Sequence, residues 1–172
     1  MIDAPLNVRL KNLKTGELVE AVIEPVVAKD FALIKKSKDR FDKFDWSNQK
    51  KKEVYKLRLK EDDLIVGLLC IIDHQDPGVD AIEIELLEAS NENIGKGKTY
   101  DQIGGCLIAF ACRESFKRGH GGCVFLTPKT SLINHYANKY GFKYEPISIP
   151  GRPNGFMVHY EEGARKMITA YL

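Results

Sequence analysis

The stretch that decides the fold is IEIELLEASNENIGKGKTYDQIGG, which runs from Ile82 to Gly105. Its first five residues alternate apolar and acidic side chains, as a half-buried strand does. Leu87 breaks the alternation, which predicts a β-bulge that returns Glu88 to the acidic face. A polar loop with glycines at Gly95 and Gly97 follows, and the closing Gly-Gly opens an apolar segment with helical spacing. The stretch therefore predicts a strand, a glycine loop and a helix, in that order.

A glycine loop between a strand and a helix is typical of a phosphate-binding site. The amide groups at the start of a helix are free, its dipole is positive there, and glycine lets an anion approach the main chain. Lys96 and Lys98 add positive charge beside the glycines. The alternative interpretation of the same residues is a flexible surface loop.

Three classes of phosphate ligand compete for this loop. Gly97-Lys98-Thr99 resembles the end of a nucleotide P-loop, but Glu92 stands where that motif has its first glycine. A dinucleotide motif is incomplete, because Tyr100 stands where the third glycine belongs. Coenzyme A is the remaining candidate.

The rest of the chain is consistent with one α/β domain over residues 1–172, a length that suits a single core. We expect a mixed, largely antiparallel sheet of six or seven strands flanked by helices. It is parallel only where the strands at Ile82 and Cys123 are joined through the long helix. The remaining predicted elements are a hairpin over 7–23, a short helix within 27–36, strands at 54–59, 65–72, 123–126, 142–148 and 155–160, helices at 103–117, 130–139 and 164–172, and aromatic anchors Phe41, Phe44 and Trp46 in a charged loop.

Four stretches of the chain are informative when taken together. They are EVYKL (Glu53–Leu57), LLEASNEN (Leu86–Asn93), KTYDQIGGCLIAFACRES (Lys98–Ser115) and VFLTPKTSLINHY (Val124–Tyr136). Together they resemble the GNAT superfamily of N-acetyltransferases, in particular its short bacterial members, over about half of the chain. This resemblance implies a sheet whose central strands splay apart, and an enzyme that transfers an acetyl group from acetyl-CoA to a primary amine by direct attack in a ternary complex.

The resemblance also implies where the cofactor would bind. The pantetheine arm would lie against the main chain of the bulged strand, and the family's Q/RxxGxG/A motif falls on Thr99, Gln102 and Gly104. Thr99 replaces an Arg or Gln and Gln102 replaces a glycine, so a nearby lysine would have to supply the missing charge. The cofactor-binding residues expected on this basis are Leu86, Leu87, Lys96, Gly97, Lys98, Thr99, Gln102, Ile103, Gly104, Gly105 and Lys129, the last standing where many members have an Asn.

Two residues are candidates for the chemistry, because the attacking amine must lose a proton and the departing thiolate must gain one. Glu88, at the end of the bulged strand, is the candidate base, acting through water; a solvated carboxylate is the alternative. Tyr136 follows Pro128 on a helix where the family often has the tyrosine that protonates the sulfur. A core tyrosine is the alternative there, with Tyr140 as the reserve donor.

The composition of the chain argues against several classes of binding partner. With 26 Lys and Arg against 24 Asp and Glu, the formal charge of +2 gives no strong attraction to nucleic acid or to an anionic membrane. The start of the chain does not resemble a signal peptide, and no apolar run approaches the roughly 20 residues of a membrane helix. The four cysteines lack CxxC spacing and the four histidines are scattered, so we expect reduced, buried thiols in the cytoplasm, surface or half-buried histidines, and no metal site.

The acceptor cannot be identified from the sequence beyond a small-molecule or peptide amine, and a homodimer is allowed. The specificity for the acceptor amine would depend on residues 27–48. Two other functions remain open. One is a catalytically silent acyl-CoA-binding regulatory module of the same fold, and the other is a nucleotide-binding protein that uses Gly97-Lys98-Thr99.

Overall fold

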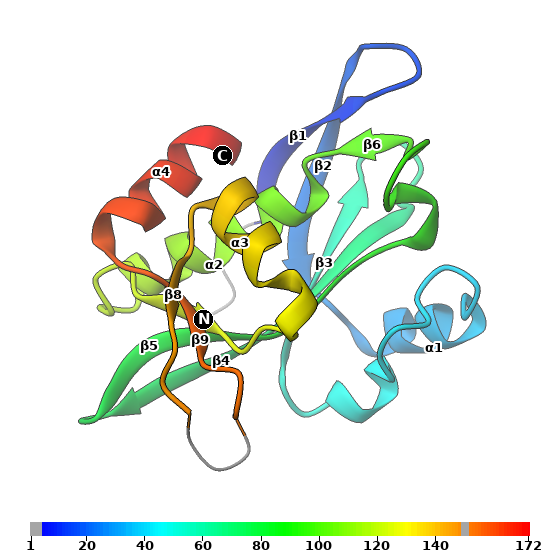
Figure 1. Ribbon diagram of the computed structural model, residues 1–172. Coiled ribbons are helices and arrows are strands. Elements are labelled where there is room, and N and C mark those ends of the chain that lie inside the picture. Colours follow the sequence, from blue (N-terminus) through cyan, green and yellow to red (C-terminus); the bar gives the residue numbers. More distant parts are fainter. Residues whose placement is uncertain (1–4, 149–151) are drawn as a thin grey trace. The chain divides into compact units, whose positions relative to one another are not determined.

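The computed structural model describes residues 5–148 and 152–172 (Figure 1). Nine strands lie within these residues, more than the six or seven expected, whereas the α/β class and the largely antiparallel sheet are confirmed. The elements in chain order are β1 (Leu6–Asn12), β2 (Leu18–Pro25), α1 (Ala28–Lys36), η1 (Trp46–Gln49), β3 (Glu53–Leu59), β4 (Ile65–Asp76), β5 (Val79–Ala89), η2 (Asn91–Asn93), β6 (Tyr100–Asp101), α2 (Ile103–Lys117), β7 (Val124–Leu126), η3 (Thr130–Leu132), α3 (Ile133–Tyr140), β8 (Lys143–Glu145), β9 (Phe156–His159) and α4 (Glu161–Tyr171), where η marks short 3₁₀ helices.

The chain divides into two compact units. The first comprises Met1–Ile71 and Leu86–Leu107, and the second comprises Ile72–Glu85 and Ile108–Leu172. Strands β4 and β5 and helix α2 each run from one unit into the other, so neither unit is a contiguous piece of sequence. The assignment of residues 1–172 to one domain stays a prediction.

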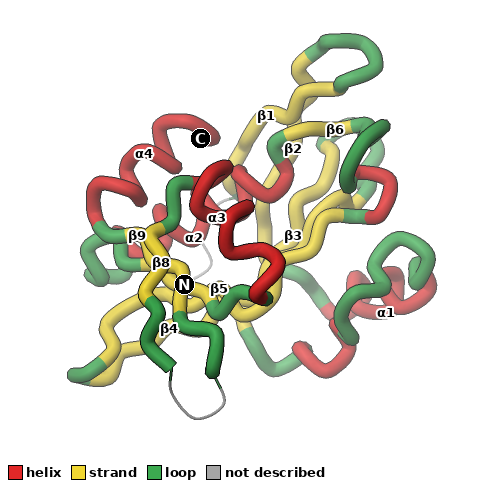
Figure 2. The backbone as a smooth tube through the Cα atoms, viewed as in Figure 1, coloured by secondary structure: helices red, strands yellow, loops and turns green. Residues whose placement is uncertain are grey.

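The sheet of the first unit has the strand order β6-β1-β2-β3-β4-β5. Its predicted hairpin is confirmed, with Leu6 opposite Ile23 and Lys11 opposite Leu18. The turn forms because the Asn12 side chain accepts hydrogen bonds from the two following turn amides and Gly16 adopts a φ of 76°. Figure 2 shows this hairpin extending beyond its neighbouring strands in yellow and green.

Helix α1 is fixed at its start by one buried carboxylate. Asp30 accepts a hydrogen bond from the backbone amide of Val27 at 2.9 Å, which caps the helix. The same carboxylate forms a 2.8 Å ion pair with Lys56 of β3, and both residues are buried. Because an unpaired charge would be costly there, the pair fixes the position of α1 along β3.

The aromatic residues of the charged loop after α1 are anchors, as expected. Phe41 and Trp46 are buried and Phe44 is half-buried, at 6.3 Å from Trp46 in an edge-to-face arrangement. They join a hydrophobic cluster that closes one side of the first unit. Its buried members are Phe31, Ile34, Phe41, Trp46, Val54, Ile65, Leu68 and Cys70, with Val26, Phe44 and Leu86 packed against them.

The sheet of the second unit has the strand order β4-β5-β7-β9-β8. Strands β5 and β7 are parallel, with Ile82 opposite Val124 and Glu83 opposite Phe125, which confirms the predicted parallel pair. The recorded pairing stops after these two positions, while β7 ends at Leu126 and β5 continues to Ala89. The two strands therefore share only a short ladder, as splayed central strands do.

The predicted elements are present, with ends that differ from the observed ones by up to four residues; the strand predicted over 142–148, for example, is β8 over Lys143–Glu145. Helix α2 has the predicted bounds, whereas α4 begins three residues before the predicted 164 and β4 extends to Asp76. The predicted helix over 130–139 is a 3₁₀ turn followed by α3, which Gly141 ends in a left-handed conformation. Within the described residues, no helix combines the length and apolar character needed to cross a bilayer.

Candidate active site

The predicted glycine loop leads directly into α2, and all of its residues belong to the first unit. Gly95 and Gly97 have φ angles of 72° and 82°, which side chains rarely adopt, and both are exposed. The helix begins at Ile103, so the main-chain amides of its first turn are available to an anion. The glycine conformations and the free helix amides are the features that the predicted phosphate site requires.

Gln102, just before α2, is the most informative residue of this turn. Its φ is 77°, in the left-handed region that favours glycine, and only one other non-glycine residue among those described, Asp63, has a positive φ. The sequence motif places a glycine at this position, so the backbone has the conformation that the motif requires although the side chain differs. The Gln102 carbonyl accepts the amide of Cys106 at 2.9 Å, which begins the helical hydrogen-bond pattern.

Buried polar side chains hold the two ends of the glycine loop. The amide of Tyr100 donates to the Asn93 side chain at 2.9 Å, and Asn93 in turn donates to the Ser90 hydroxyl at 2.8 Å. Both of these side chains are buried. The carbonyl of Thr99 accepts the amide of Leu13 at 2.8 Å. The glycine segment is therefore a loop with fixed ends.

The two lysines of the loop differ in their availability. Lys98 forms a 2.7 Å ion pair with Asp101, so its charge is shared with a protein carboxylate. Lys96 is exposed, and it has no hydrogen-bond or ion-pair partner among the described residues. Of the two, Lys96 is the one free to meet a phosphate group.

The start of α2 lies directly against β4 at Gly67. A β-carbon placed there would stand 2.7 Å from the Ile103 side chain and 2.9 Å from that of Leu107. Glycine therefore allows the first turn of the helix to reach the sheet, which fixes the position of the predicted phosphate site.

Glu88 is a buried carboxylate, so the alternative interpretation of it as a solvated residue at the strand end is wrong. It is 2% exposed, and its oxygens accept the indole N–H of Trp46 at 2.8 Å and the amide of Lys43 at 3.1 Å. Leu86 packs against the hydrophobic cluster that contains Trp46. An irregular register lies between Leu57 and Arg58 in the pairing of β3 with β4. The bulge expected at Leu87 stays a prediction.

The loop between α1 and η1 is bound to the segment that follows Glu88. Asn91 donates from its backbone to the Arg40 carbonyl at 2.8 Å, and its side chain donates to Asp42 at 3.0 Å. The Arg40 guanidinium binds Glu92, with a 2.9 Å bond from Nε. Burial alone would raise the pKa of Glu92, but the hydrogen bonds and charge of Arg40 outweigh it and lower that pKa. These contacts join partners about 50 positions apart, so local sequence patterns could not reveal them.

Tyr136 and Lys129 lie in the second unit. Tyr136 is half-buried on α3, with its ring edge-to-face on Phe142 at 5.9 Å and 6.3 Å from Tyr140. Burial raises the pKa of Tyr136, so the phenol stays protonated. Its hydroxyl has no hydrogen-bond partner among the described residues, whereas Tyr140, the reserve, is buried. Lys129 is exposed in the turn before η3.

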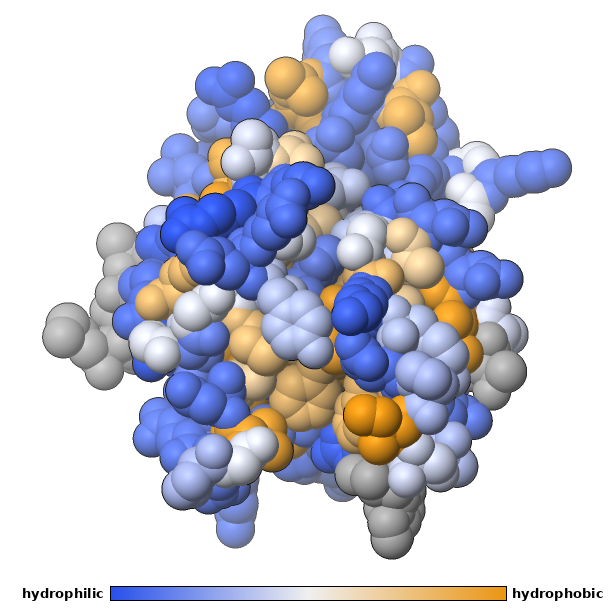
Figure 3. All heavy atoms as spheres, turned by 60° about the vertical axis from the view of Figure 1, so that its left-hand side comes forward, coloured by the Kyte–Doolittle hydropathy of each residue, from blue (hydrophilic) through white to orange (hydrophobic). Residues whose placement is uncertain are grey.

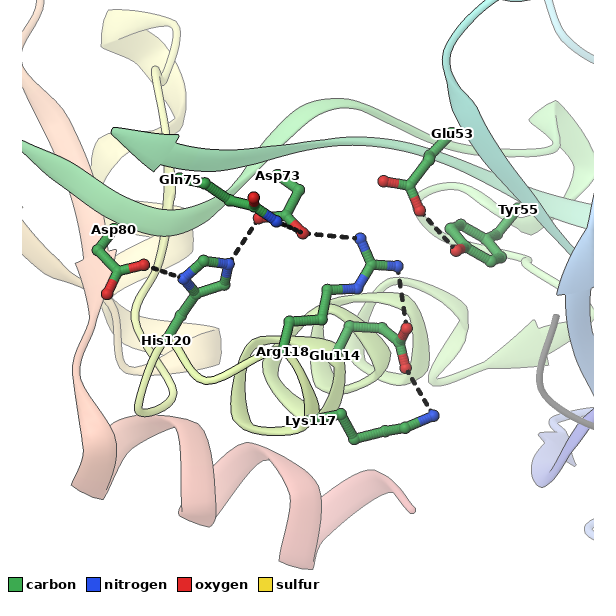
Figure 4. A network of polar contacts seen from close by, with 9 residues as sticks. All are labelled: Glu53, Tyr55, Asp73, Gln75, Asp80, Glu114, Lys117, Arg118 and His120. Carbon is green, nitrogen blue, oxygen red and sulfur yellow. Dashed lines mark hydrogen bonds and ion pairs between the residues drawn. The ribbon is translucent and has the colours of Figure 1, made fainter. Parts of the chain in front are cut away.

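Two of the four histidines are buried, which corrects the prediction that all are surface or half-buried. His120 lies between two carboxylates, with Nε2 2.6 Å from Asp73 and Nδ1 in contact with Asp80 (Figure 4). Burial alone would raise the pKa of Asp73, but hydrogen bonds from His120 and Arg118 lower it. His159 is buried against Phe142 at 4.0 Å, and desolvation lowers its pKa. His120 is thus buried because acidic groups surround it, and His159 is buried as a neutral ring.

The cysteines are buried thiols with one exception. Cys70, Cys106 and Cys112 are buried, whereas Cys123 is half-buried. Burial raises the pKa of Cys106 and Cys112 to about 12, so neither is a nucleophile near neutral pH. No group of three or more potential metal ligands stands together within the described part of the chain.

An apolar hollow lies in the second unit. Its volume is about 300 Å³, and its lining includes Phe125, Phe156 and Tyr160. Figure 3 shows one face of the molecule on which apolar side chains gather in a depression with hydrophilic groups around them. The residues predicted for the active site are not among those that line this hollow.

No protein-family model matches the sequence, and no curated protein matches it. Solved structures do. The variant of the toxin AtaT bound to the C-terminus of the antitoxin AtaR and to acetyl-CoA is 12% identical, with a TM-score of 0.54 over 87% of this chain and 98% of AtaT. A protein from Bordetella pertussis described as a GNAT-family acetyltransferase is 12% identical, with a TM-score of 0.55 over 91% and 98%. The Bacillus subtilis N-acetyltransferase YlbP, solved with coenzyme A, is 14% identical, with a TM-score of 0.54 over 83% and 97%.

These similarities extend over most of each chain, at identities too low to carry an activity. They show that the chain has the fold of the GNAT N-acetyltransferases, as the sequence resemblance implied.

Proposed function

We propose that this protein is an N-acetyltransferase that transfers the acetyl group of acetyl-CoA to a primary amine in a ternary complex. The observation that carries the proposal is the left-handed backbone of Gln102 at the head of α2, in a chain with the GNAT fold. Two similar structures hold the ligand that this turn would bind, acetyl-CoA in AtaT and coenzyme A in YlbP.

In this proposal the pyrophosphate lies at the residues from Gly95 to Gly105. The first-turn amides of α2 donate to its oxygens, and Lys96 adds a positive charge that no carboxylate of residues 5–148 and 152–172 shares in an ion pair. The pantetheine arm follows the main chain of Leu86 and Leu87, and Lys129 contacts the phosphate or ribose end.

The reaction has one bond-forming and one bond-breaking event. The amine nitrogen attacks the thioester carbon, the carbon–sulfur bond breaks, and coenzyme A leaves as a thiol. The amine proton passes to Glu88 through water, and the sulfur takes a proton from Tyr136. An ionised carboxylate has about four lone-pair sites, of which the recorded bonds to Trp46 and Lys43 occupy two, so Glu88 can still accept from a water. The raised pKa of Tyr136 keeps its proton available for the thiolate.

A primary amine remains the proposed acceptor, and the cytoplasm the proposed location. The AtaT structure contains the C-terminus of a protein partner, so peptides and proteins belong in an acceptor screen beside small amines.

The test is release of free coenzyme A thiol from acetyl-CoA in the presence of a panel of primary amines. The proposal expects turnover with at least one amine above the rate with buffer alone. Acetyl-CoA binding without turnover across the panel would favour the silent acyl-CoA-binding module. Calorimetric binding of ATP but not of acetyl-CoA would favour the nucleotide-binding alternative.

A further inference from the structure

The first unit contains a cavity of about 400 Å³ beside α1 that the cofactor and proton-transfer proposals do not use. Its lining comes from the end of α1, the loop after it and the start of η1, all within residues 31–47. The apolar part of the lining is mostly aromatic: Phe31, Ile34, Phe41, Phe44 and Trp46. A ring or an aliphatic group would therefore find an apolar surface here.

Two lysines of the lining are free. Lys35 and Lys38 are exposed, and neither has a hydrogen-bond or ion-pair partner among the described residues. The third lysine of the lining, Lys43, donates to the Asn91 side chain at 2.9 Å. Positive charge without a protein partner is thus concentrated at Lys35 and Lys38.

The carboxylates of the lining are already engaged. Asp45 accepts from the amide and hydroxyl of Ser47 and from Asn48 at 3.2 Å, as the cap of η1. Asp42 accepts from Asn91 at 3.0 Å. These carboxylate oxygens have protein donors, whereas neither lysine has a hydrogen-bond or ion-pair partner in the described part of the chain. The cavity therefore suits an anion better than a cation.

The charges of the two lysines act on the cavity. The Ser47 hydroxyl is the main reason that the pKa of Asp45 is lowered, and the positive charges of Lys35 and Lys38 lower it further. Both ammonium groups therefore stand near a carboxylate of the lining.

The part of the lining that follows α1 in the chain is held in place. Trp46 and Lys43 both donate to the buried carboxylate of Glu88, and the Arg40 carbonyl accepts from Asn91. A wall with fixed position gives a preformed site, which loses little entropy when a ligand enters.

We propose that this cavity binds an organic anion whose apolar or aromatic part lies against the aromatic lining and whose negative group lies at Lys35 and Lys38. If the proposed function holds, on which this step rests, the ligand is the acceptor, a primary amine that also carries a carboxylate or phosphate. The pair of lysines then selects acidic amines over neutral ones.

The test compares three probes that share their apolar part and differ in the polar group. They are 3-phenylpropionate, 3-phenylpropanamide and 3-phenylpropylamine, each titrated by calorimetry into the full chain. Trp46 is the only tryptophan of the chain, so its fluorescence reports whether binding is at this cavity. We expect the carboxylate to bind at least about tenfold more tightly than the amide and to change the Trp46 emission, because only the carboxylate forms charge-assisted ion pairs with the ammonium groups of Lys35 and Lys38. Phenyl phosphate, as a further arm, shows which anionic group is preferred.

Two double variants localise the effect. Lys35→Gln with Lys38→Gln should abolish the preference for the carboxylate. Lys29→Gln with Lys36→Gln, both on α1 but outside the lining, should leave it unchanged. Equal affinities of carboxylate and amide, tighter binding of the amine, or equal losses in both double variants would overturn the proposal. These titrations need no acetyl-CoA, so their failure is separate from a failure to turn over the thioester.

Discussion

The indole N–H of Trp46 donates to the carboxylate of Glu88 at 2.8 Å across 42 positions of sequence, and both side chains are 2% exposed. This contact joins the loop after α1 to the end of β5. It gives Glu88 a positioning role whether or not it also accepts the amine proton. A positioning residue and a base differ in how their loss changes the dependence of turnover on pH.

Glu88→Gln separates these roles. The amide can replace only one of the two acceptor oxygens, so we expect a loss of about 1–3 kcal/mol in the free energy of unfolding. If Glu88 is also the base, turnover falls at least ~10²-fold near neutral pH and recovers partly at high pH, where the amine deprotonates itself. Turnover against pH, with the amine found in the screen, is the measurement.

Trp46→Phe is the matched control, because it removes the indole donor and leaves the Glu88 carboxylate in place. Because Trp46 also lines the cavity beside α1, the comparison uses kcat at saturating amine. A base at Glu88 predicts that this variant keeps most of its kcat at neutral pH. Equal losses in both variants at every pH would assign Glu88 to positioning alone.

Gln102→Gly tests the conformation at the head of α2. A side chain with a φ of 77° is strained by about 1 kcal/mol, and glycine removes that strain at some cost in unfolded-state entropy. We expect the glycine variant to unfold at the same or a higher temperature and to bind acetyl-CoA at least as tightly as the wild type. Gln102→Ala, which keeps the β-carbon, should show no gain in stability. A glycine variant that binds acetyl-CoA markedly more weakly would show that the Gln102 side chain itself contacts the ligand.

Tyr136→Phe tests the proton donor. The lost interaction belongs to the transition state, so kcat should fall while the affinity for acetyl-CoA stays nearly constant. Because burial raises the pKa of Tyr136, the folded protein keeps its proton where the unfolded chain loses it. The stability that Tyr136 contributes is therefore complete below about pH 10 and is lost as pH rises above it, and the Phe variant should lack this component. A Phe variant with full turnover would move the role to Tyr140 or to solvent.

The sequence predicts most elements whose signals are local. The bounds of α2 follow from its helical spacing, and the hairpin from Gly16 between two apolar runs. The two-residue strand β6 was missed, because Tyr100 and Asp101 carry no strand pattern and pair only through β1. A short ladder of this kind depends on the partner strand.

The site was predicted where it depends on backbone geometry and missed where it depends on distant partners. The glycines and the helix start identify the loop, whereas Glu88 was assigned from a break in alternation, which says nothing of its partners. Its true surroundings come from Trp46 and Lys43, more than 40 positions away. The burial of His120 likewise depends on Asp73 and Asp80, which no spacing rule connects to it.

The most direct test of the account is calorimetric titration of acetyl-CoA into the wild type, Gly104→Glu and Gly104→Gln. Gly104 lies in the first turn of α2, where a carboxylate stabilises the helix, so the Glu variant should remain folded. The account predicts that the wild type binds acetyl-CoA, that Gly104→Gln binds more weakly for steric reasons, and that Gly104→Glu, with a negative charge at the pyrophosphate position, shows no measurable binding. A folded Gly104→Glu variant with wild-type affinity, or a wild type that does not bind acetyl-CoA, would contradict it.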